Sequence, residues 1–395
     1  MRTFTRRDFL KTSAAAAAAI TPAFGSGIDP NEDYKALVCV LLEGGADTLD
    51  MVIPKFDVHA HRSYTQVRTG LAHPRRKIRP LVGSRYGLHP AMPNLQKRYH
   101  LKDLAIVANV GTLEEPVTKS AILRGAATLP PQLFQRVAQR DWAMDAGGTN
   151  GWAARVGDHL GRPMTNISVG GLNRMQEGAR HAPLIAHDEH FGVLDDPDGI
   201  MRRLERVDIG AGRSQDNTRT LHEQLEIVAS LMAARRSARF PGRQIYFVRH
   251  SGWETGGLDY ESAVERNRAN IAELDRALGA FGAALDGLGL GEKVTTFTTT
   301  DVSAGMRFPQ GADHGWGGHM LVMGGAVRGG LYGTMPRFVP DSPDALDGNT
   351  VIPTIATDQY LATLVDWLGD GAIDLHGVFP RLKKFDKATL GFMKA

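Results

Sequence analysis

The chain has almost no cysteine. Cys39 is the single cysteine among 395 residues, so no disulfide can form within the chain. This residue lies in the apolar run at residues 36–42, and a lone cysteine in such a run is typical of core packing. We therefore expect Cys39 to be buried in the core.

The chain also has little net charge. It carries 46 lysines and arginines against 43 aspartates and glutamates, an excess of three positive charges. The first eleven residues alone hold four basic residues and one acid, the same excess, so the rest of the chain is close to neutral. A balance of this kind gives no global positive field, and we expect no nucleic-acid partner.

Long, strongly hydrophobic runs are missing, even at the N-terminus. Residues 5–11 read TRRDFLK, an alanine-rich run follows at residues 14–20, and residues 23–25 form a small-x-small site. Paired arginines ahead of a weakly apolar run are typical of a twin-arginine export signal. The alanine run is too weakly hydrophobic to span a membrane. We expect residues 1–25 to be a signal peptide, the mature protein to lack a transmembrane segment, and its location to be periplasmic or secreted.

The remaining sequence has the composition of a soluble globular protein, with 42% hydrophobic and 23% charged residues. Helical spacing of apolar residues predicts helices at residues 218–239 and 260–285. Runs rich in β-branched and apolar residues predict strands at residues 36–42, 104–110, 166–169, 244–249, 294–300 and 320–323. Strands that alternate with helices indicate an α/β fold, with helices on both faces of the sheet.

We find no internal repeat and no linker, and we expect a single domain over residues 26–395. Two segments are expected to be loop excursions from the core, near residues 54–93 and 333–353. The first of these has scattered histidine, arginine and proline residues and is predicted to be irregular.

Acidic residues follow three of the predicted strands. One strand leads into EGGAD at residues 43–47, another into HSGWE at residues 250–254, and a third into Asp301. Because ligands of open α/β sheets bind beyond the carboxyl ends of the strands, we expect these acids to converge at one edge. Carboxylates with a few imidazoles suit zinc, manganese, magnesium or calcium. For each acid alone, capping of a helix or turn is the alternative.

Two histidines and an acid lie in a glycine-rich loop just before the last predicted strand. Residues 311–325 read GADHGWGGHMLVMGG, where the glycines let the backbone bend tightly around Asp313, His314 and His319. These residue types are metal ligands. The alternative is a structural role, with Asp313 capping a turn and Trp316 filling the core. A redox cofactor is not supported, because GGAVRGG at residues 324–330 lacks the G-x-G-x-x-G spacing.

Five stretches of the chain form an ordered set of motifs. They are ALVCVLLEGGADTLDMVIP (residues 36–54), LHPAMPNL (88–95), EPVTKSAILRGAATLPPQLF (115–134), ADHGWGGHMLVMGGAVRGGLYG (312–333) and PTIATDQYLATLVDWLG (353–369). Together they resemble the DUF1501 family, exported bacterial proteins placed in the alkaline phosphatase and sulfatase superfamily. The resemblance implies an alkaline-phosphatase-like three-layer sandwich, in which a mixed, mainly parallel sheet carries a dinuclear metal site at one edge.

The resemblance also implies which residues bind metal. The family's GG-x-D motif is present at residues 44–47, so Asp47 is the expected ligand. Asp301 keeps the acid of a second motif, although the Phe-Gly-Arg that follows it in the family is absent. Glu254 stands for the aspartate of a G-W-D-T-H motif. His314 completes this set, with Asp313 and His319 as further candidates.

Other ligand positions have changed. Gly256 replaces the histidine of the G-W-D-T-H motif, and the family's S-H-x-x-Q segment reads QRVAQ at residues 135–139. Arg136 therefore stands where a histidine would bind metal, and a guanidinium cannot act as a ligand. We expect Arg136 to form salt bridges with Asp47 and Asp301 in place of the metal site.

The surviving ligands would hold one divalent ion (zinc, manganese, magnesium or calcium) rather than two, and the alternative is that no metal binds. We expect a degenerate site in a non-catalytic binding or assembly protein. The alternative is a periplasmic metal-dependent hydrolase of phosphate or sulfate esters. The partner would be a small ester or another protein, and no spacing singles out a nucleophile.

Overall fold

The computed structural model describes residues 33–145, 150–178, 183–186, 204–206, 219–235, 242–308 and 315–394. Its strands are β1 (Lys35–Leu42), β2 (Val52–Pro54), β3 (Arg79–Pro80), β4 (Tyr86–Leu88), β5 (Leu104–Gly111), β6 (Met164–Ser168), β7 (Leu184–Ala186), β8 (Leu204–Arg206), β9 (Arg243–His250), β10 (Val294–Thr300), β11 (Gly318–Met323), β12 (Gly330–Tyr332) and β13 (Ile355–Ala356).

The α-helices are α2 (Val58–Arg68), α3 (Pro93–His100), α4 (Lys119–Leu123), α5 (Arg136–Asp145), α6 (Trp152–His159), α8 (Leu221–Ala234), α9 (Tyr260–Gly287), α10 (Thr357–Leu368) and α11 (Leu375–Val378). Short 3₁₀ helices are η1 (Thr48–Asp50), η2 (Thr69–Leu71), η3 (Arg174–Gln176) and η5 (Pro380–Lys384). None of the helices in the described ranges combines the length and apolar character that a membrane crossing requires.

A mixed sheet forms the centre of the molecule. Its strand order is β12-β5-β11-β10-β1-β9-β6-β7-β8, and β13 also pairs with β5. The central strand β1 is parallel to both neighbours, β9 and β10, and β6 continues the parallel set beside β9. Antiparallel pairs occur where β11 lies between β10 and β5, and where β8 pairs with β7. The predicted mixed, mainly parallel sheet is confirmed.

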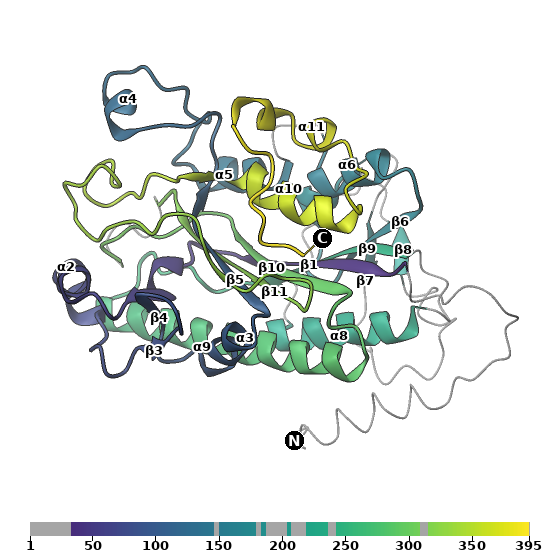
Figure 1. The fold of residues 1–395 in the computed structure, drawn as a ribbon, viewed down its shortest axis with the longest axis horizontal. Coiled ribbons are helices and arrows are strands. Elements are labelled where there is room, and N and C mark those ends of the chain that lie inside the picture. Colours follow the sequence, from purple (N-terminus) through teal and green to yellow (C-terminus); the bar gives the residue numbers. More distant parts are fainter. Residues whose placement is uncertain are drawn as a thin grey trace, which may run out of the picture.

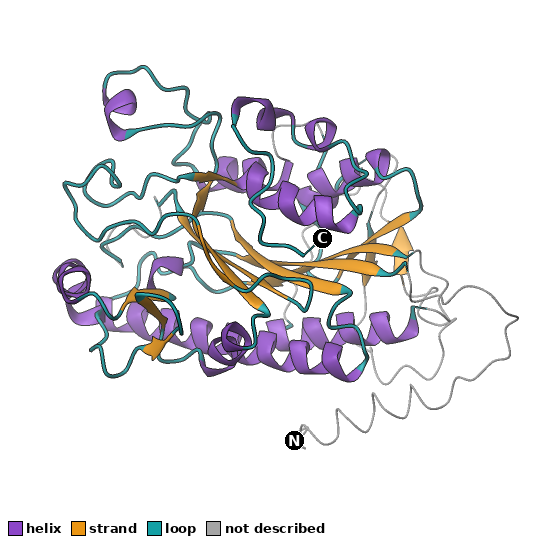
Figure 2. Ribbon diagram, viewed as in Figure 1, coloured by secondary structure: helices purple, strands orange, loops and turns teal. Residues whose placement is uncertain are grey.

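Helices cover both faces of this sheet. Helices α3, α8 and α9 lie on one face, and α5, α6, α10 and α11 on the other (Figures 1 and 2). Alternate residues of β1 point to opposite layers. Val38 and Val40 pack in the cluster that contains the α8 and α9 residues, whereas Leu37 and Cys39 pack with α6 and α10. Cys39 is buried and free, as expected.

The predicted strands and helices are present. All six predicted strands appear, with ends shifted by at most two residues. The helix predicted at residues 260–285 is α9, and its N-cap Asp259 accepts a hydrogen bond from the backbone of Ser262. The helix predicted at residues 218–239 is α8, which begins at a capping box formed by Thr220 and Glu223. Part of that predicted range lies outside the described residues.

The segment near residues 54–93 is more regular than predicted. It contains helix α2, whose N-cap Asp57 accepts hydrogen bonds from two backbone N–H groups, and a small sheet of order β2-β4-β3. Residues 333–353 contain no helix or strand. The first excursion shares a small apolar core with the second one, in which Ile53, Tyr64 and Ile78 pack with Phe338 and Val351.

Candidate functional site

The segments that follow β1, β9 and β10 come together at one edge of the sheet, as predicted. The backbone N–H of Trp253, after β9, donates to the carbonyl of Glu43, after β1, at 3.3 Å. The backbone N–H of Ala304, after β10, donates to the carbonyl of Ala46 at 3.2 Å. Three chain segments that are far apart in sequence thus form one wall.

Glycine is required where two of these segments touch. Gly44 has a φ of +119°, and a Cβ added there would lie 2.5 Å from the backbone nitrogen of Glu254. Any other side chain would be both strained and in collision with backbone. The first glycine of the GG-x-D motif is therefore explained by packing alone.

Asp301 is buried and uses its carboxylate to hold the loop after β1. It accepts hydrogen bonds from the backbone N–H groups of Gly44 at 3.1 Å, Gly45 at 3.3 Å and Val302 at 2.9 Å. Converging backbone N–H groups neutralise an anion much as a cation does. Part of the ligand capacity of Asp301 is thus already used by the protein.

Asp47 forms a bidentate ion pair with Arg68, the last residue of α2. Nη2 of Arg68 donates to Oδ1 of Asp47 at 3.0 Å, and Nη1 donates to Oδ2. Both side chains have an exposed fraction of 0%. Burial lowers the pKa of Arg68, but the charges of Asp47 and Asp50 outweigh burial and leave that pKa above its usual value. The guanidinium also lies over the ring of Phe338, 5.4 Å from its centroid.

The cation beside Asp47 is therefore Arg68. Sequence analysis assigned this place to Arg136, which begins α5 and whose side chain lies outside the described residues. A guanidinium cannot give up its proton under ordinary conditions or coordinate a metal. A cation at Asp47 would have to displace a buried ion pair.

Of the other predicted ligands, Glu254 and His319 have described side chains, and each accepts a hydrogen bond from a backbone N–H group. Glu254 is half-buried, and its Oε1 accepts a hydrogen bond from the backbone of Gly256 at 3.4 Å. His319, on β11, is buried, and its Nδ1 accepts from the backbone of Asn109 at 3.3 Å. Burial and the charge of Arg68 lower the pKa of His319 to about 3. Asp313 and His314 lie outside the described residues.

The described part of the glycine-rich loop, residues 315–318, packs tightly against its neighbours. Trp316 is buried, and its Nε1 donates to the carbonyl of Thr112 at 2.6 Å. A Cβ added at Gly318 would lie 2.4 Å from Oγ of Ser303 and 2.5 Å from Oγ1 of Thr48. These contacts give residues 315–318 a structural role.

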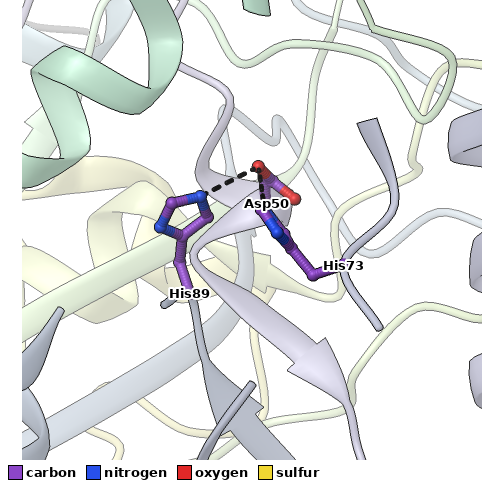
Figure 3. Close-up of side chains that lie close together, drawn as sticks. All are labelled: Asp50, His73 and His89. Carbon is purple, nitrogen blue, oxygen red and sulfur yellow. Dashed lines mark ion pairs between the residues drawn. The ribbon is translucent and has the colours of Figure 1, made fainter. Parts of the chain in front are cut away.

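A cluster that sequence analysis did not predict lies beside the Asp47–Arg68 pair. Oδ2 of Asp50, in η1, is 3.7 Å from Nε2 of His73 and 3.7 Å from Nε2 of His89 (Figure 3). The two imidazole rings meet edge to face, with centroids 4.4 Å apart. The hydroxyl of Tyr64 donates to Oδ1 of Asp50 at 3.2 Å and accepts from the backbone N–H of His73 at 3.1 Å.

The charges in this cluster are set by burial and by mutual contact. Burial raises the pKa of Asp50, but His73, which faces its carboxylate, and the charges of His89 and Arg68 outweigh burial and lower that pKa overall. Burial lowers the pKa of His89 to about 4, although the charge of Asp50 opposes this shift. At neutral pH the cluster therefore holds a carboxylate beside a neutral His89 imidazole.

Two of these three residues, Asp50 and His89, lie in the motif stretches and could have been identified as candidates from the sequence. Asp50 lies in the first of the five motif stretches, three residues after Asp47, and His89 lies in LHPAMPNL. His73 lies in the segment predicted to be irregular, and no spacing connects it to either residue. The fold of residues 54–93 brings the three together.

An open groove of about 510 Å³ lies between α2, the start of α9 and the loop after β12. It is lined by Ser63, Gln66, Val67, Thr69, Tyr260, Arg307, Phe308, Phe338, Val339 and Pro340. No aspartate, glutamate or histidine is among these lining residues.

A family model and an export-signal model each match part of the chain. The model of the family described as "Protein of unknown function (DUF1501)" matches residues 200–361, which include the glycine-rich stretch. A twin-arginine translocation signal matches residues 3–23. The resemblance to DUF1501 is thereby confirmed over that region, and the chain carries a signal for export to the periplasm. No curated protein matches the chain.

Solved structures match over most of the chain at low identity. A protein of the alkaline phosphatase superfamily from Vibrio parahaemolyticus is 13% identical, with a TM-score of 0.42, and the match covers 93% of this chain and 76% of that one. The lipoteichoic acid synthase LtaP from Listeria monocytogenes is 9% identical, with a TM-score of 0.40 and coverage of 89% and 80%.

The C-terminal periplasmic domain of EcEptC from Escherichia coli is 12% identical, with a TM-score of 0.40 and coverage of 93% and 92%. Similarity at this level carries no information about the activity of the present chain.

Proposed function

We propose that this exported protein is a single-domain, non-catalytic binding or assembly protein, whose ancestral metal site is closed by its own side chains. The observation that carries the proposal is the buried, bidentate ion pair between Asp47 and Arg68. Asp47 is the ligand that the family resemblance implies. Its two oxygens already face a permanent cation.

The energetics favour the ion pair over a metal at this position. Removing one partner of a buried pair typically destabilises a protein by about 3–5 kcal/mol, because the other charge is left unpaired. An ion that bound Asp47 would leave Arg68 in that state, with Phe338 and Tyr64 packed around it. The cost of leaving Arg68 unpaired would therefore weaken metal binding at Asp47.

Two further observations support the same proposal. Asp301, the second expected acid, is held by three backbone N–H groups of the wall that it stabilises. The groove beside α2 has no acid or histidine among its lining residues.

The alternative is a periplasmic metal-dependent hydrolase of phosphate or sulfate esters, with one ion held by Asp47, Asp301 and His314. This function requires that Arg68 move away from Asp47. The partner of a non-catalytic protein would instead be a small ester that is bound but not cleaved, or another protein.

Turnover measurements on the exported, mature protein distinguish the two. Aryl phosphate and aryl sulfate esters are supplied with zinc, manganese, magnesium or calcium, one ion at a time. We expect no turnover above that of a His314→Ala variant. Metal-dependent turnover that disappears in Asp47→Ala or His314→Ala, with folding intact by circular dichroism, would overturn the proposal.

A further inference from the structure

We propose that Asp50, His73 and His89 form a binding site for one divalent transition-metal ion of the zinc class. The site lies apart from Asp47 and Asp301. This inference goes beyond the proposed function, because it assigns a structural metal site to a protein that is proposed to be non-catalytic.

The three side chains come from separate parts of the chain and converge on one point. Asp50 belongs to η1, His73 follows η2, and His89 follows β4. One ligand atom from each lies within 4.8 Å of the other two. Figure 3 shows both rings directed toward the same carboxylate.

The distances fit an ion better than they fit direct hydrogen bonds. Each Nε2 is 3.7 Å from Oδ2 of Asp50, beyond the usual hydrogen-bond range. Two ligands bound to one tetrahedral zinc ion lie roughly 3.4 Å apart, given metal–ligand bonds of about 2.0–2.1 Å. A contraction of a few tenths of an ångström therefore brings each nitrogen–oxygen distance to that value, and the ligand atoms of the three residues already lie within 4.8 Å of one another.

The polar atoms around this point are incompletely satisfied without a cation. Nε2 of His73 is buried and has no hydrogen-bond partner. Tyr64 donates to Oδ1 of Asp50 and fixes the carboxylate, which leaves Oδ2 directed at the two rings. This is the support that a metal-binding carboxylate receives from its neighbours.

One hydrogen bond, between Ala91 and His89, disfavours metal binding and lowers the expected affinity. The backbone N–H of Ala91 donates to Nδ1 of His89 at 3.0 Å, which leaves the ring proton on Nε2, the atom that faces Asp50. Metal binding at Nε2 requires the ring proton to move to Nδ1. There it faces the N–H of Ala91, so the hydrogen bond between Ala91 and His89 is lost. Loss of such support typically weakens a metal site by about 10–100-fold, so we expect moderate rather than tight binding.

The donor set defines the class of ion. Two imidazoles and one carboxylate suit zinc, cobalt or iron(II), whereas magnesium and calcium prefer oxygen ligands. Three protein ligands leave one position for water. Bound there, the ion would join η1 to the segments before β3 and after β4, at one end of the small sheet, and it would stabilise that excursion.

Titration of the mature protein tests the site. Protein treated with a chelator and then dialysed is titrated with Zn²⁺ by calorimetry and with Co²⁺ by visible absorption, which reports coordination geometry. We expect one equivalent of either ion to bind and the thermal midpoint to rise. Wild-type protein that binds neither ion, or binds without a rise in the midpoint, would overturn the assignment.

Matched variants identify the ligands. His73→Gln and His89→Gln should each weaken binding by about 100-fold or more, because loss of a ligand exceeds loss of a ligand's support. His100→Gln, on the exposed end of α3, is the control and should bind as wild type does. Unchanged binding in both ligand variants would contradict the proposal.

His73 is the most exposed of the three side chains, at 20%, so His73→Gln remains informative if His89→Gln fails to fold. Ester turnover is measured in parallel. Metal binding without turnover supports both proposals. Turnover that depends on Asp47 would overturn only the non-catalytic function.

Discussion

Asp47 and Asp50 are three residues apart, both are buried, and they have different partners. Asp47 faces the guanidinium of Arg68 in a bidentate pair at 3.0 Å. Asp50 faces two imidazoles at 3.7 Å and one tyrosine hydroxyl at 3.2 Å. Their exposed fractions, 0% and 1%, are almost the same.

The difference shows that the partner, rather than burial or sequence position, decides what a buried acid can bind. A guanidinium stays charged and has no lone pair to offer, so the Asp47–Arg68 pair is closed to metals. A neutral imidazole can share a ligand role with the carboxylate. The residue implied by the family motif is thus the less suitable of the two for a metal.

The largest effect is expected from breaking the Asp47–Arg68 pair. Arg68→Met leaves Asp47 buried without its cation and should lower the free energy of unfolding by about 3–5 kcal/mol. Urea denaturation measures this loss. The double variant Asp47→Leu with Arg68→Met should recover most of it, since an apolar pair can replace a buried ion pair. A loss below about 1 kcal/mol for Arg68→Met, the range of exposed pairs, would refute the closed-site description.

A smaller loss of stability is expected from substitution of Asp301, whose carboxylate, like that of Asp47, is bound by groups of the protein itself. Asp301→Asn removes the charge that the N–H groups of Gly44, Gly45 and Val302 stabilise. Hydrogen bonds to charged groups contribute about 1.5–3 kcal/mol, and we expect a loss of this size in urea denaturation. Unchanged stability would mean that Asp301 is available as a ligand after all.

Substitution of Gly44, in the wall that contains Asp47, can be compared with substitution of Gly83, between β3 and β4. Both have a positive φ, but a Cβ at Gly44 meets the backbone of Glu254 at 2.5 Å, and a Cβ at Gly83 meets nothing within 4 Å. Gly83→Ala should lose only the conformational strain, about 1–2 kcal/mol. Gly44→Ala should lose more in the same denaturation experiment, and equal losses would show that the contact is unimportant.

The smallest expected effect concerns pH and the Asp50 cluster. The pKa of His89 is lowered from 6.5 to about 4 in the folded protein. Between these values the unfolded chain takes up a proton that the folded protein does not, so the free energy of unfolding falls as pH decreases from 6.5 toward 4. His89→Gln should reduce this slope but not abolish it, because His319 shifts in the same direction. If stability depends on pH equally in the variant and in wild type, burial does not lower the pKa of His89 in the folded protein.

The sheet and its two helical layers could be predicted because their signals are local. Apolar, β-branched runs mark β1, β9 and β10, and parallel strands bring their carboxyl ends together wherever the chain goes next. The wall of segments around Asp301 followed from that rule alone.

The partners of the acids could not be predicted, and α2 shows why. Its buried residues are His61, Tyr64 and Arg68, which share a helical face but are all polar or amphipathic. A search for apolar periodicity passes over such a helix. The position of Arg68 opposite Asp47, and of His73 opposite Asp50, depends on how residues 54–93 fold back on the sheet.

Metal binding by Asp47→Asn and Asp50→Asn, measured side by side, tests the comparison most directly. Each substitution keeps the shape of the side chain and removes one carboxylate, and both proteins are titrated with Co²⁺ after folding is verified. We predict that Asp47→Asn still binds one equivalent and that Asp50→Asn does not. Binding that is lost in Asp47→Asn and retained in Asp50→Asn would contradict the account.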